Sequence, residues 1–426
     1  MTTEFLFPYG DSFLQANIPA ENISFILKKQ ELPAVDNEWE AITDSLNSPI
    51  ECPPLIECIQ ENDRIVVIVT DNTRACPDDR LLPPILAKLE QKIPRDNITI
   101  MIALGLHPPL NKKGLIAKLG DDVIENYRVV NHDVNDTVYA GTTSRGTPVE
   151  INRLVVEADF RLSTGFIEPH FFAGFSGGRK SIAPGVFSVR SAHVNHGYKM
   201  IEHPRARAGV LQGNPIHEDM VEQAKIANLN FIVNVLLNKN GEITRIVAGD
   251  PYIAHERGCE LEKKIAMVKV GHKVDITITT NGGAPLDLDL YQTCKGIDTA
   301  SQITRDGGII IIASSCNAGL GPKEFLNLHA SADSPKEVLQ NIKLKKPAGV
   351  QWQNQILARA QLKNDIYLVS NLNDNLVNGM MMSPVSTIEE GIEKAFQVLG
   401  RDAEVAIIAE GPSVLPCLDE QEYTGQ

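Results

Sequence analysis

The sequence predicts an α/β protein of two domains with mainly parallel sheets. Short, β-branched apolar runs recur along the chain, each followed by a glycine-rich or polar turn and then by a segment with helical spacing. At 426 residues the chain is too long for one ordinary core. Its 43% hydrophobic content, with 31 glycines and 25 prolines, is that of a folded globular protein.

The expected elements follow in chain order. Two segments between the strands, 78–92 and 386–400, show the apolar spacing of helices. In 231–249, Asn240-Gly241 stands between two strand-like runs and predicts an antiparallel hairpin. Seven β-branched segments bounded by turns predict buried strands: 64–74, 97–107, 159–170, 274–280, 307–315, 365–370 and 404–411.

A domain boundary is expected near residues 268–273. The segment 254–270 reads as a connecting helix, and a new series of strand, turn and helix begins at Val274. We therefore expect an N-terminal α/β domain over 1–270 and a smaller one over 271–426, with the active site in the cleft between them.

Composition narrows the class of function. The formal charge of −14 argues against a general partner of nucleic acids or anionic membranes. The first residues carry Glu4 and Asp11 and have no basic segment, unlike a signal peptide, and no apolar run is long enough to span a bilayer. The seven cysteines are odd in number and scattered, which is typical of reduced thiols. We expect a cytoplasmic protein.

The stretch EPHFFAGFSGGRKSIAPG, residues 168–185, resembles a phosphate-binding loop but departs from it. Arg179 stands where the second glycine of that motif is required, although Lys180 follows as the motif asks. Pro184 and Gly185 would interrupt the helix that a phosphate loop needs behind its lysine. Nucleotide hydrolysis is therefore disfavoured, and Lys180 requires another purpose.

Polar residues follow three of the predicted strands in the N-terminal half: Asp71 and Arg74 in DNTR, His107 in LGLH and His170 in IEPH. Ligands of open α/β sheets bind outside the carboxyl ends of strands. Histidines titrate near neutrality and are the usual proton shuttles. Two such histidines facing a substrate would suit removing a proton on one side and returning one on the other.

Two further patterns are ambiguous when taken alone. His193 and His196 are three apart, but a metal site normally needs at least three protein ligands. Gln292 and Lys295 share one face at the start of a predicted helix, and spacing alone makes that face an ordinary solvated one.

Taken together, these segments resemble the nickel-dependent lactate racemase family. The resemblance covers about residues 8 to 415, and its most specific parts are the GGRK loop and the block NGGAPLDLDLYQTCKGID. It also rests on DNTR, LGLH, NHGY and GNPIHEDM. It implies Rossmann-like domains and a nickel pincer nucleotide, a pyridinium mononucleotide whose two sulfurs and one carbon bind the metal together with one histidine.

The resemblance also implies a role for each matching residue. Lys180 corresponds to the lysine that tethers the cofactor through an amide, and His196 to the nickel ligand, which makes His193 the less favoured of the pair. His107 and His170 correspond to the proton-transfer histidines. Five residues correspond to those lining the cofactor and substrate pocket: Asp71, Arg74, Tyr291, Gln292 and Lys295.

The implied reaction is racemisation of a small 2-hydroxy acid. The α-hydrogen leaves as hydride, a 2-keto acid forms and rotates, and hydride returns to its other face while the two histidines exchange protons. Arg74 or Lys295 would hold the substrate carboxylate. Cofactor-maturation proteins are the expected partners; nucleic acids and membranes are not.

Two departures from the family pattern leave the substrate open. His107 is followed by Pro108-Pro109 where an arginine is expected, and ASSCNAGLG (313–321) lacks an acidic residue before its glycine. The alternatives are the same chemistry on malate, a longer aliphatic 2-hydroxy acid or a sugar acid. A non-catalytic carrier of the nickel nucleotide is a further alternative, but it would have no use for His107 and His170.

Overall fold

The computed structural model describes residues 1–418 and divides into two compact units. The N-terminal unit comprises Glu31–His196 and Arg205–Ile265. The C-terminal unit comprises Met1–Gln30, Gly197–Pro204 and the chain from Ala266 onward. Among residues 1–418, no helix has the length and apolar character needed to cross a membrane.

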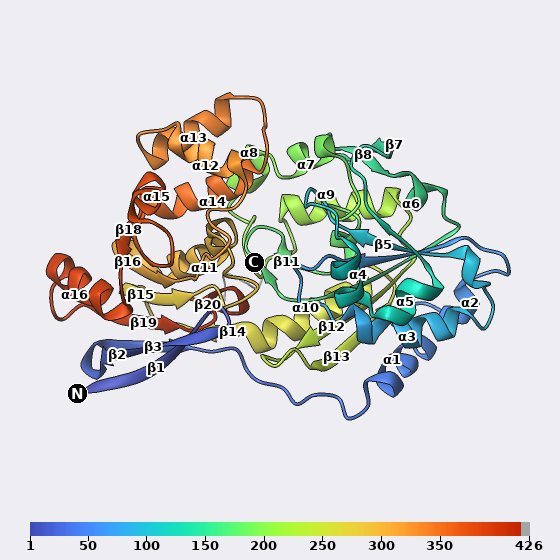
Figure 1. Ribbon diagram of the computed structural model, residues 1–426, viewed down its shortest axis with the longest axis horizontal. Helices are drawn as coiled ribbons and strands as arrows, with labels where there is room; N and C mark the ends of the chain where they lie inside the picture. Colours follow the sequence, from blue (N-terminus) through green and yellow to red (C-terminus); the bar gives the residue numbers. More distant parts are fainter. Residues whose placement is uncertain (419–426) are drawn as a thin grey trace. The chain divides into compact units, whose positions relative to one another are not determined.

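The N-terminal unit is built on a six-stranded sheet with the order β13-β12-β9-β4-β5-β6. Figure 1 labels β5, β12 and β13 of this sheet. All neighbouring pairs are parallel except β12 and β13, which form the antiparallel hairpin expected at Asn240-Gly241. The strands of this sheet are β4 (Ile65–Thr70), β5 (Ile98–Ala103), β6 (Arg128–Asn131), β9 (Phe160–Phe166), β12 (Phe231–Leu237) and β13 (Ile243–Gly249).

Both faces of this sheet are buried, which explains why its strands are continuous apolar runs. Successive residues of β4 point to opposite faces of the sheet. Val67 therefore packs into one hydrophobic core and Ile68 into another. The remaining elements of the unit are α1 (Glu38–Asn47), α2 (Leu55–Cys58), α3 (Asp78–Leu89), η2 (Arg95–Asn97), α4 (Lys112–Leu119), α5 (Asp121–Asn126), β7 (Thr137–Thr142), β8 (Pro148–Asn152), α6 (Arg153–Glu157), β10 (Pro169–His170), β11 (Gly174–Phe175), η3 (Gly178–Ser181), α7 (Val189–Asn195), α9 (Pro215–Ile226) and α10 (Ile253–Ala266).

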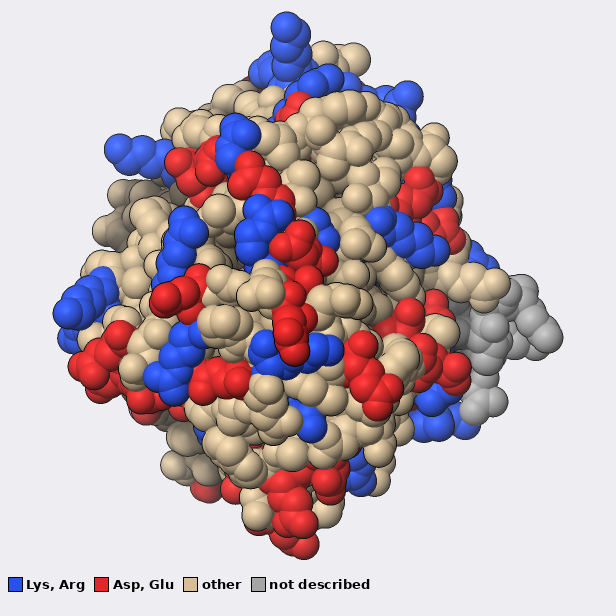
Figure 2. All heavy atoms as spheres, turned by 90° about the vertical axis from the view of Figure 1, so that its right-hand side faces the viewer, with Lys and Arg blue, Asp and Glu red and all other residues tan. Residues whose placement is uncertain are grey.

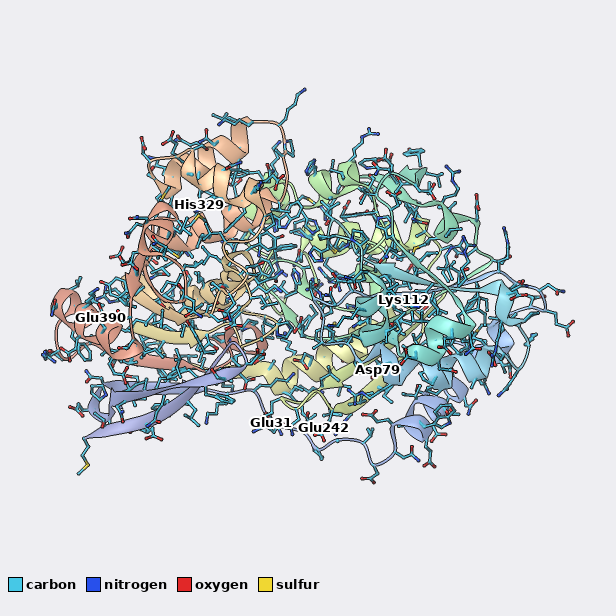
Figure 3. The ribbon with its side chains drawn as sticks, viewed as in Figure 1. Glu31, Asp79, Lys112, Glu242, His329 and Glu390 are labelled. Carbon is cyan, nitrogen blue, oxygen red and sulfur yellow. The ribbon has the colours of Figure 1, made fainter. Side chains whose placement is uncertain are left out.

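The C-terminal unit has a second six-stranded sheet, with the order β18-β17-β16-β15-β19-β3, in which every pair is parallel. His329, labelled in Figure 3, is buried and joins α12 (Lys323–Ala330) to α14 (Gln351–Gln361) through hydrogen bonds with Asn354 and Gln361. The unit contains β1 (Thr2–Tyr9), β2 (Ser12–Pro19), η1 (Ala20–Asn22), β3 (Ile23–Leu27), α8 (Tyr198–Glu202), β14 (Met267–Lys269), β15 (Val274–Thr280), α11 (Leu290–Ile303), β16 (Thr304–Ala313), α12 (Lys323–Ala330), α13 (Pro335–Leu344), α14 (Gln351–Gln361), β17 (Asp365–Val369), α15 (Asp374–Gly379), β18 (Ser383–Val385), α16 (Ile388–Leu399), β19 (Val405–Ile408), η4 (Gly411–Ser413) and β20 (Leu415–Cys417).

The division of the chain differs from the expected domains 1–270 and 271–426 in three places, and the smallest is the boundary itself, which falls between Ile265 and Ala266. Residues 1–30 belong to the C-terminal unit because β3 pairs with β19 at the edge of its sheet. Residues 197–204 also belong there, since the main chain of α8 accepts hydrogen bonds from Gln355 and Arg359 of α14. Pairings between segments so distant in the chain leave no local signal in the sequence.

The expected strands and the helices at 78–92 and 386–400 are confirmed as β4, β5, β9, β15, β16, β17, β19, α3 and α16. The phosphate-loop interpretation fails as expected, because Lys180 lies in η3, a helix of four residues. On the face drawn in Figure 2, acidic and basic side chains are interspersed.

Candidate active site

The turn DNTR begins where β4 ends, and its first residue is a buried carboxylate. Asp71 Oδ1 accepts hydrogen bonds from the main-chain N–H and the hydroxyl of Thr73, the latter at 2.8 Å. Its other oxygen, Oδ2, lies 2.6 Å from Nδ1 of His107, which follows the neighbouring strand β5. A carboxylate can only accept, so His107 donates through Nδ1, and Nε2 carries the lone pair whenever the imidazole is neutral. This contact joins the turns that follow the neighbouring strands β4 and β5.

The neighbours of Asp71 shift the pKa of its carboxyl group. Burial raises it, but the hydrogen bond and charge of His107, the charge of Arg74 and the hydroxyl of Thr73 outweigh burial and lower the pKa of Asp71 to about 2. The Arg74 side chain itself hydrogen-bonds to the carbonyl and hydroxyl of Thr73, both at 3.3 Å.

This shift predicts a loss of stability in acid. Because the folded pKa of Asp71 lies below the ordinary aspartate value of 3.8, its contribution to stability is complete above about pH 4 and is lost as the pH falls toward 2. We expect Asp71→Asn to be less stable than the parent by about 2 kcal/mol at neutral pH, and the difference to vanish near pH 2. Urea unfolding of both proteins at several pH values measures it; a difference independent of pH would contradict the assignment.

A buried ion pair between Lys118 and Asp78 stabilises the same turn. Nζ of Lys118, on α4, lies 2.9 Å from Oδ2 of Asp78, at the start of α3, and donates to the carbonyls of Cys76 and Arg74 at 2.7 and 3.3 Å. Asp78 also accepts hydrogen bonds from hydroxyls on two strands, those of Thr70 and Thr164. One buried lysine therefore fixes the main chain that carries Arg74.

Removing this lysine is expected to destabilise the fold. Lys118→Met leaves the fully buried Asp78 carboxylate without its counter-charge, which costs about 3 to 5 kcal/mol. The matched control is Lys112→Met at the exposed start of α4, labelled in Figure 3, with an expected change within about 0.5 kcal/mol. Urea unfolding at neutral pH compares them, and equal effects would contradict the role of Lys118.

The loop that carries His107 lies against the glycine-rich loop. The N–H of Gly105 donates to the carbonyl of Gly185 at 2.9 Å. Gly105 has a φ of +56°, and a side chain there would also lie only 3.3 Å from the carbonyl oxygen of Pro184. Pro184 and Gly185, which break the helix of a phosphate loop, thus contact the histidine loop.

His170 lies in β10, four residues after the end of β9, and its ring is buried. The N–H of Ala173 donates to Nδ1 at 3.3 Å, and Nε2 lies 3.2 Å from Nζ of Lys180. The rings of Phe171 and Phe172 pack on the imidazole with centroids 4.7 and 4.6 Å away. The structure therefore brings His170 and Lys180 into direct contact.

Hydrogen bonds from and to buried side chains fix the main chain that precedes Lys180. The N–H of Gly178 donates to Oδ1 of Asn234 on β12 at 2.7 Å. The buried guanidinium of Arg179 donates to the carbonyls of Gly177 and Ala173 at 3.1 and 2.7 Å. The residue that replaces the phosphate-loop glycine thus fixes the loop that presents Lys180.

His196 is the C-cap of α7 and is oriented by two buried polar residues. Nδ2 of Asn195 donates to Oδ2 of Asp219 at 2.6 Å, which leaves Oδ1 of Asn195 to accept from Nδ1 of His196 at 2.8 Å. Nε2 of His196 is therefore the nitrogen with the lone pair. Burial, followed by the charges of Lys180 and His193, lowers the pKa of His196 to about 3, so its imidazole is neutral. A neutral imidazole is the form that binds a metal.

Asp219 is the anchor of this arrangement. It is fully buried and accepts hydrogen bonds from four side chains: Thr143, Thr147, Asn195 and Gln223. Sequence reasoning missed Asn195, Asp219 and Lys118 as supporting residues. Asp219 lies within GNPIHEDM and Asn195 beside His196, but only the folded chain shows that they contact.

The remaining predicted residues lie on α11 of the C-terminal unit. Asp289 caps this helix, and Tyr291 is held through its hydroxyl by Trp352 and through its carbonyl by Gln353. Gln292 and Lys295 are partly exposed near the helix start, as their spacing predicted. Their contact with cofactor or substrate, and the expected cleft between domains, stay predictions.

The chain is similar to known proteins over almost its whole length. Residues 9–209 match the family model of the lactate racemase N-terminal domain, and residues 270–416 match that of the lactate racemase C-terminal domain. Over 417 residues the chain is 38% identical to a lactate racemase of Thermoanaerobacterium thermosaccharolyticum and 37% identical to one of Lactiplantibacillus plantarum. Each alignment covers 96% of this chain and 98% of the relative.

Two solved structures have a similar fold. The lactate racemase apoprotein from Thermoanaerobacterium thermosaccharolyticum superposes with a TM-score of 0.93 at 37% identity, covering 97% of this chain and 100% of that one. A protein from Thermotoga maritima shares the fold at 16% identity, with a TM-score of 0.70 and coverage of 91% and 100%.

Proposed function

Because this chain belongs to the lactate racemase family, we propose that it interconverts the enantiomers of lactate through a 2-keto acid intermediate. The observation that carries the proposal is the pair of histidines that follow neighbouring strands and are each held at Nδ1, His107 by the Asp71 carboxylate at 2.6 Å and His170 by the N–H of Ala173 at 3.3 Å. Racemisation needs one group that removes the hydroxyl proton and a second group that returns a proton after the keto acid has rotated.

In this scheme His107 accepts the hydroxyl proton of lactate as the substrate is oxidised. The imidazolium that forms is stabilised by the adjacent Asp71 carboxylate, whose low pKa keeps it ionised. His170 returns a proton to the oxygen after the keto acid has rotated. For the opposite enantiomer the two histidines exchange roles.

Lys180 and His196 would hold the nickel pincer nucleotide, Lys180 through an amide and His196 through Nε2. When bound, this group supplies a hydride acceptor, which avoids removing a poorly acidic α-proton beside a carboxylate. The donor set supports the fit, since His196 is neutral and oriented by Asn195. Within residues 1–418, no group of three histidine, cysteine or acidic residues could hold a metal.

The substrate carboxylate requires a cation. Arg74 is the candidate in the N-terminal unit, because its guanidinium lies in the DNTR turn beside Asp71 and a planar fork binds a carboxylate through two hydrogen bonds. Lys295 of α11 is the second candidate. Tyr291 and Gln292 complete the set that we assign to the cofactor and substrate.

The test uses protein produced together with the cofactor-maturation proteins. L-lactate is incubated with it in D2O and the product is resolved by chiral chromatography and mass spectrometry. We expect a 1:1 mixture of enantiomers that keeps the original α-hydrogen. Deuterium at the α-carbon would contradict hydride transfer. Racemisation of malate, a longer aliphatic 2-hydroxy acid or a sugar acid, but not of lactate, would contradict the substrate assignment.

A further inference from the structure

Two of the seven cysteines lie in contact in the N-terminal unit. Cys52 precedes α2 and Cys58 is its last residue, and a side-chain hydrogen bond joins the two thiols. Sγ of Cys58 also donates to the carbonyl oxygen of Pro53 at 3.3 Å. Because α2 is a single turn of four residues, it returns the chain so that its last side chain lies beside the residues that precede it.

The same two cysteines are the accessible ones within residues 1–418. The side chains of Cys52 and Cys58 are partly exposed and both are free thiols, whereas the other five cysteines are buried: Cys76, Cys259, Cys294, Cys316 and Cys417. An oxidant in solution therefore meets two thiols that already contact each other.

The main chain on both sides of this thiol pair is fixed by the fold. The N–H of Ile50 donates to the carbonyl of Ala248 at 2.8 Å, at the end of β13. Nζ of Lys92 donates to the carbonyl of Ile59, and the side chains of Leu55 and Ile59 are buried in a hydrophobic core. The contact between the two thiols is thus a property of the folded unit.

We propose that Cys52 and Cys58 form a reversible disulfide when the protein meets a low-molecular-weight disulfide such as oxidised glutathione. The proposal adds a modification site to the N-terminal unit and does not depend on the proposed function.

The reaction consists of two thiol–disulfide exchanges. The thiolate of one cysteine attacks a sulfur atom of oxidised glutathione, whose S–S bond breaks, and one glutathione leaves as its thiolate. The second cysteine then attacks the protein sulfur of the mixed disulfide and displaces the other glutathione. The protein loses two electrons and two protons, and the oxidant takes up both as it becomes two molecules of reduced glutathione.

The two exchanges are expected to differ in rate. Burial raises the pKa of both thiols, that of Cys52 to about 11. Since the thiolate is the attacking form, the first exchange is slow near neutral pH. The second exchange joins groups that already lie in contact, and such intramolecular reactions are much faster than the same reaction between separate molecules. The mixed disulfide should therefore be short-lived.

The experiment incubates the full-length folded protein with excess oxidised glutathione at mildly alkaline pH. Acid stops the exchange, the remaining thiols are alkylated with N-ethylmaleimide in acidic urea, and peptides are identified by mass spectrometry. We expect Cys52 linked to Cys58, the five buried cysteines alkylated, and both thiols restored by dithiothreitol. The proposal is overturned by no reaction at the pair, by equally fast oxidation of the buried cysteines, or by glutathione held at the pair without a link.

Two variants test whether the thiols react with each other. Cys52→Ser and Cys58→Ser each remove the second attacking thiol, so the remaining cysteine should accumulate at least about tenfold more mixed disulfide than the parent after the same time. The matched control Cys417→Ser, at a buried cysteine of the C-terminal unit, should form the link at the parental rate. Equal amounts of mixed disulfide in the parent and in the two variants would refute the proposal. Neither lactate nor cofactor is used, so the result is independent of racemisation.

Discussion

Replacing His107 or His170 with alanine is expected to lower kcat for lactate racemisation by about 10² to 10⁴-fold in the loaded enzyme. Each histidine is assigned a proton transfer that the other cannot perform from its own position, and general acid–base groups contribute factors of this size. The comparison must be made at equal nickel content, because His170 also contacts Lys180.

The matched control for these variants is His272→Ala. His272 is an exposed histidine of the C-terminal unit that pairs with Glu404, and its removal should change kcat by less than about threefold. The kcat of Asp71→Asn should lie between that of His107→Ala and that of His272→Ala. The asparagine keeps an oxygen that can accept from His107, but the charge that stabilises the imidazolium is lost. Near-parental kcat in His107→Ala would remove the central argument of the proposed mechanism.

Lys180→Arg is expected to abolish both racemisation and the covalent mass increment of the matured protein. Arginine keeps a positive charge at this position, but its guanidinium stays protonated and does not form the amide. Intact mass spectrometry and nickel analysis of matured protein measure the two losses. Lys239→Arg, in the exposed β12–β13 turn, is the control and should retain both mass increment and nickel.

His196→Ala separates tethering from metal binding. It should retain the mass increment on Lys180 while losing most of its nickel, because the imidazole that we assign to the metal is gone. A mass increment that persists in Lys180→Arg would place the tether elsewhere and would contradict the assignment of Lys180.

The sequence was informative wherever a signal is local. β-branched runs placed the strands, and the order β9-β4-β5 explains why Asp71, His107 and His170 follow neighbouring strands. Pro184 and Gly185 correctly excluded a phosphate-loop helix. The cofactor and the roles of Lys180 and His196, in contrast, came only from the resemblance to a family.

What sequence reasoning missed depends on contacts between distant segments. Asn195 and His196 are neighbours, but Asp219, which orients them, comes from α9. Lys118 reaches back to Asp78 and to the carbonyl of Arg74. In a single sequence these are an ordinary aspartate and an ordinary lysine, and only burial together with their partners distinguishes them.

The pairing of β3 with β19 also bears on how the protein is made. During translation β3 leaves the ribosome well before β19, the strand with which it pairs. The C-terminal sheet therefore cannot close this edge until β19 has been synthesised, and until then β3 is an apolar strand without its partner strand and is available for aberrant association. Synthesis of this enzyme thus has a vulnerable interval that lasts until β19 is available to pair.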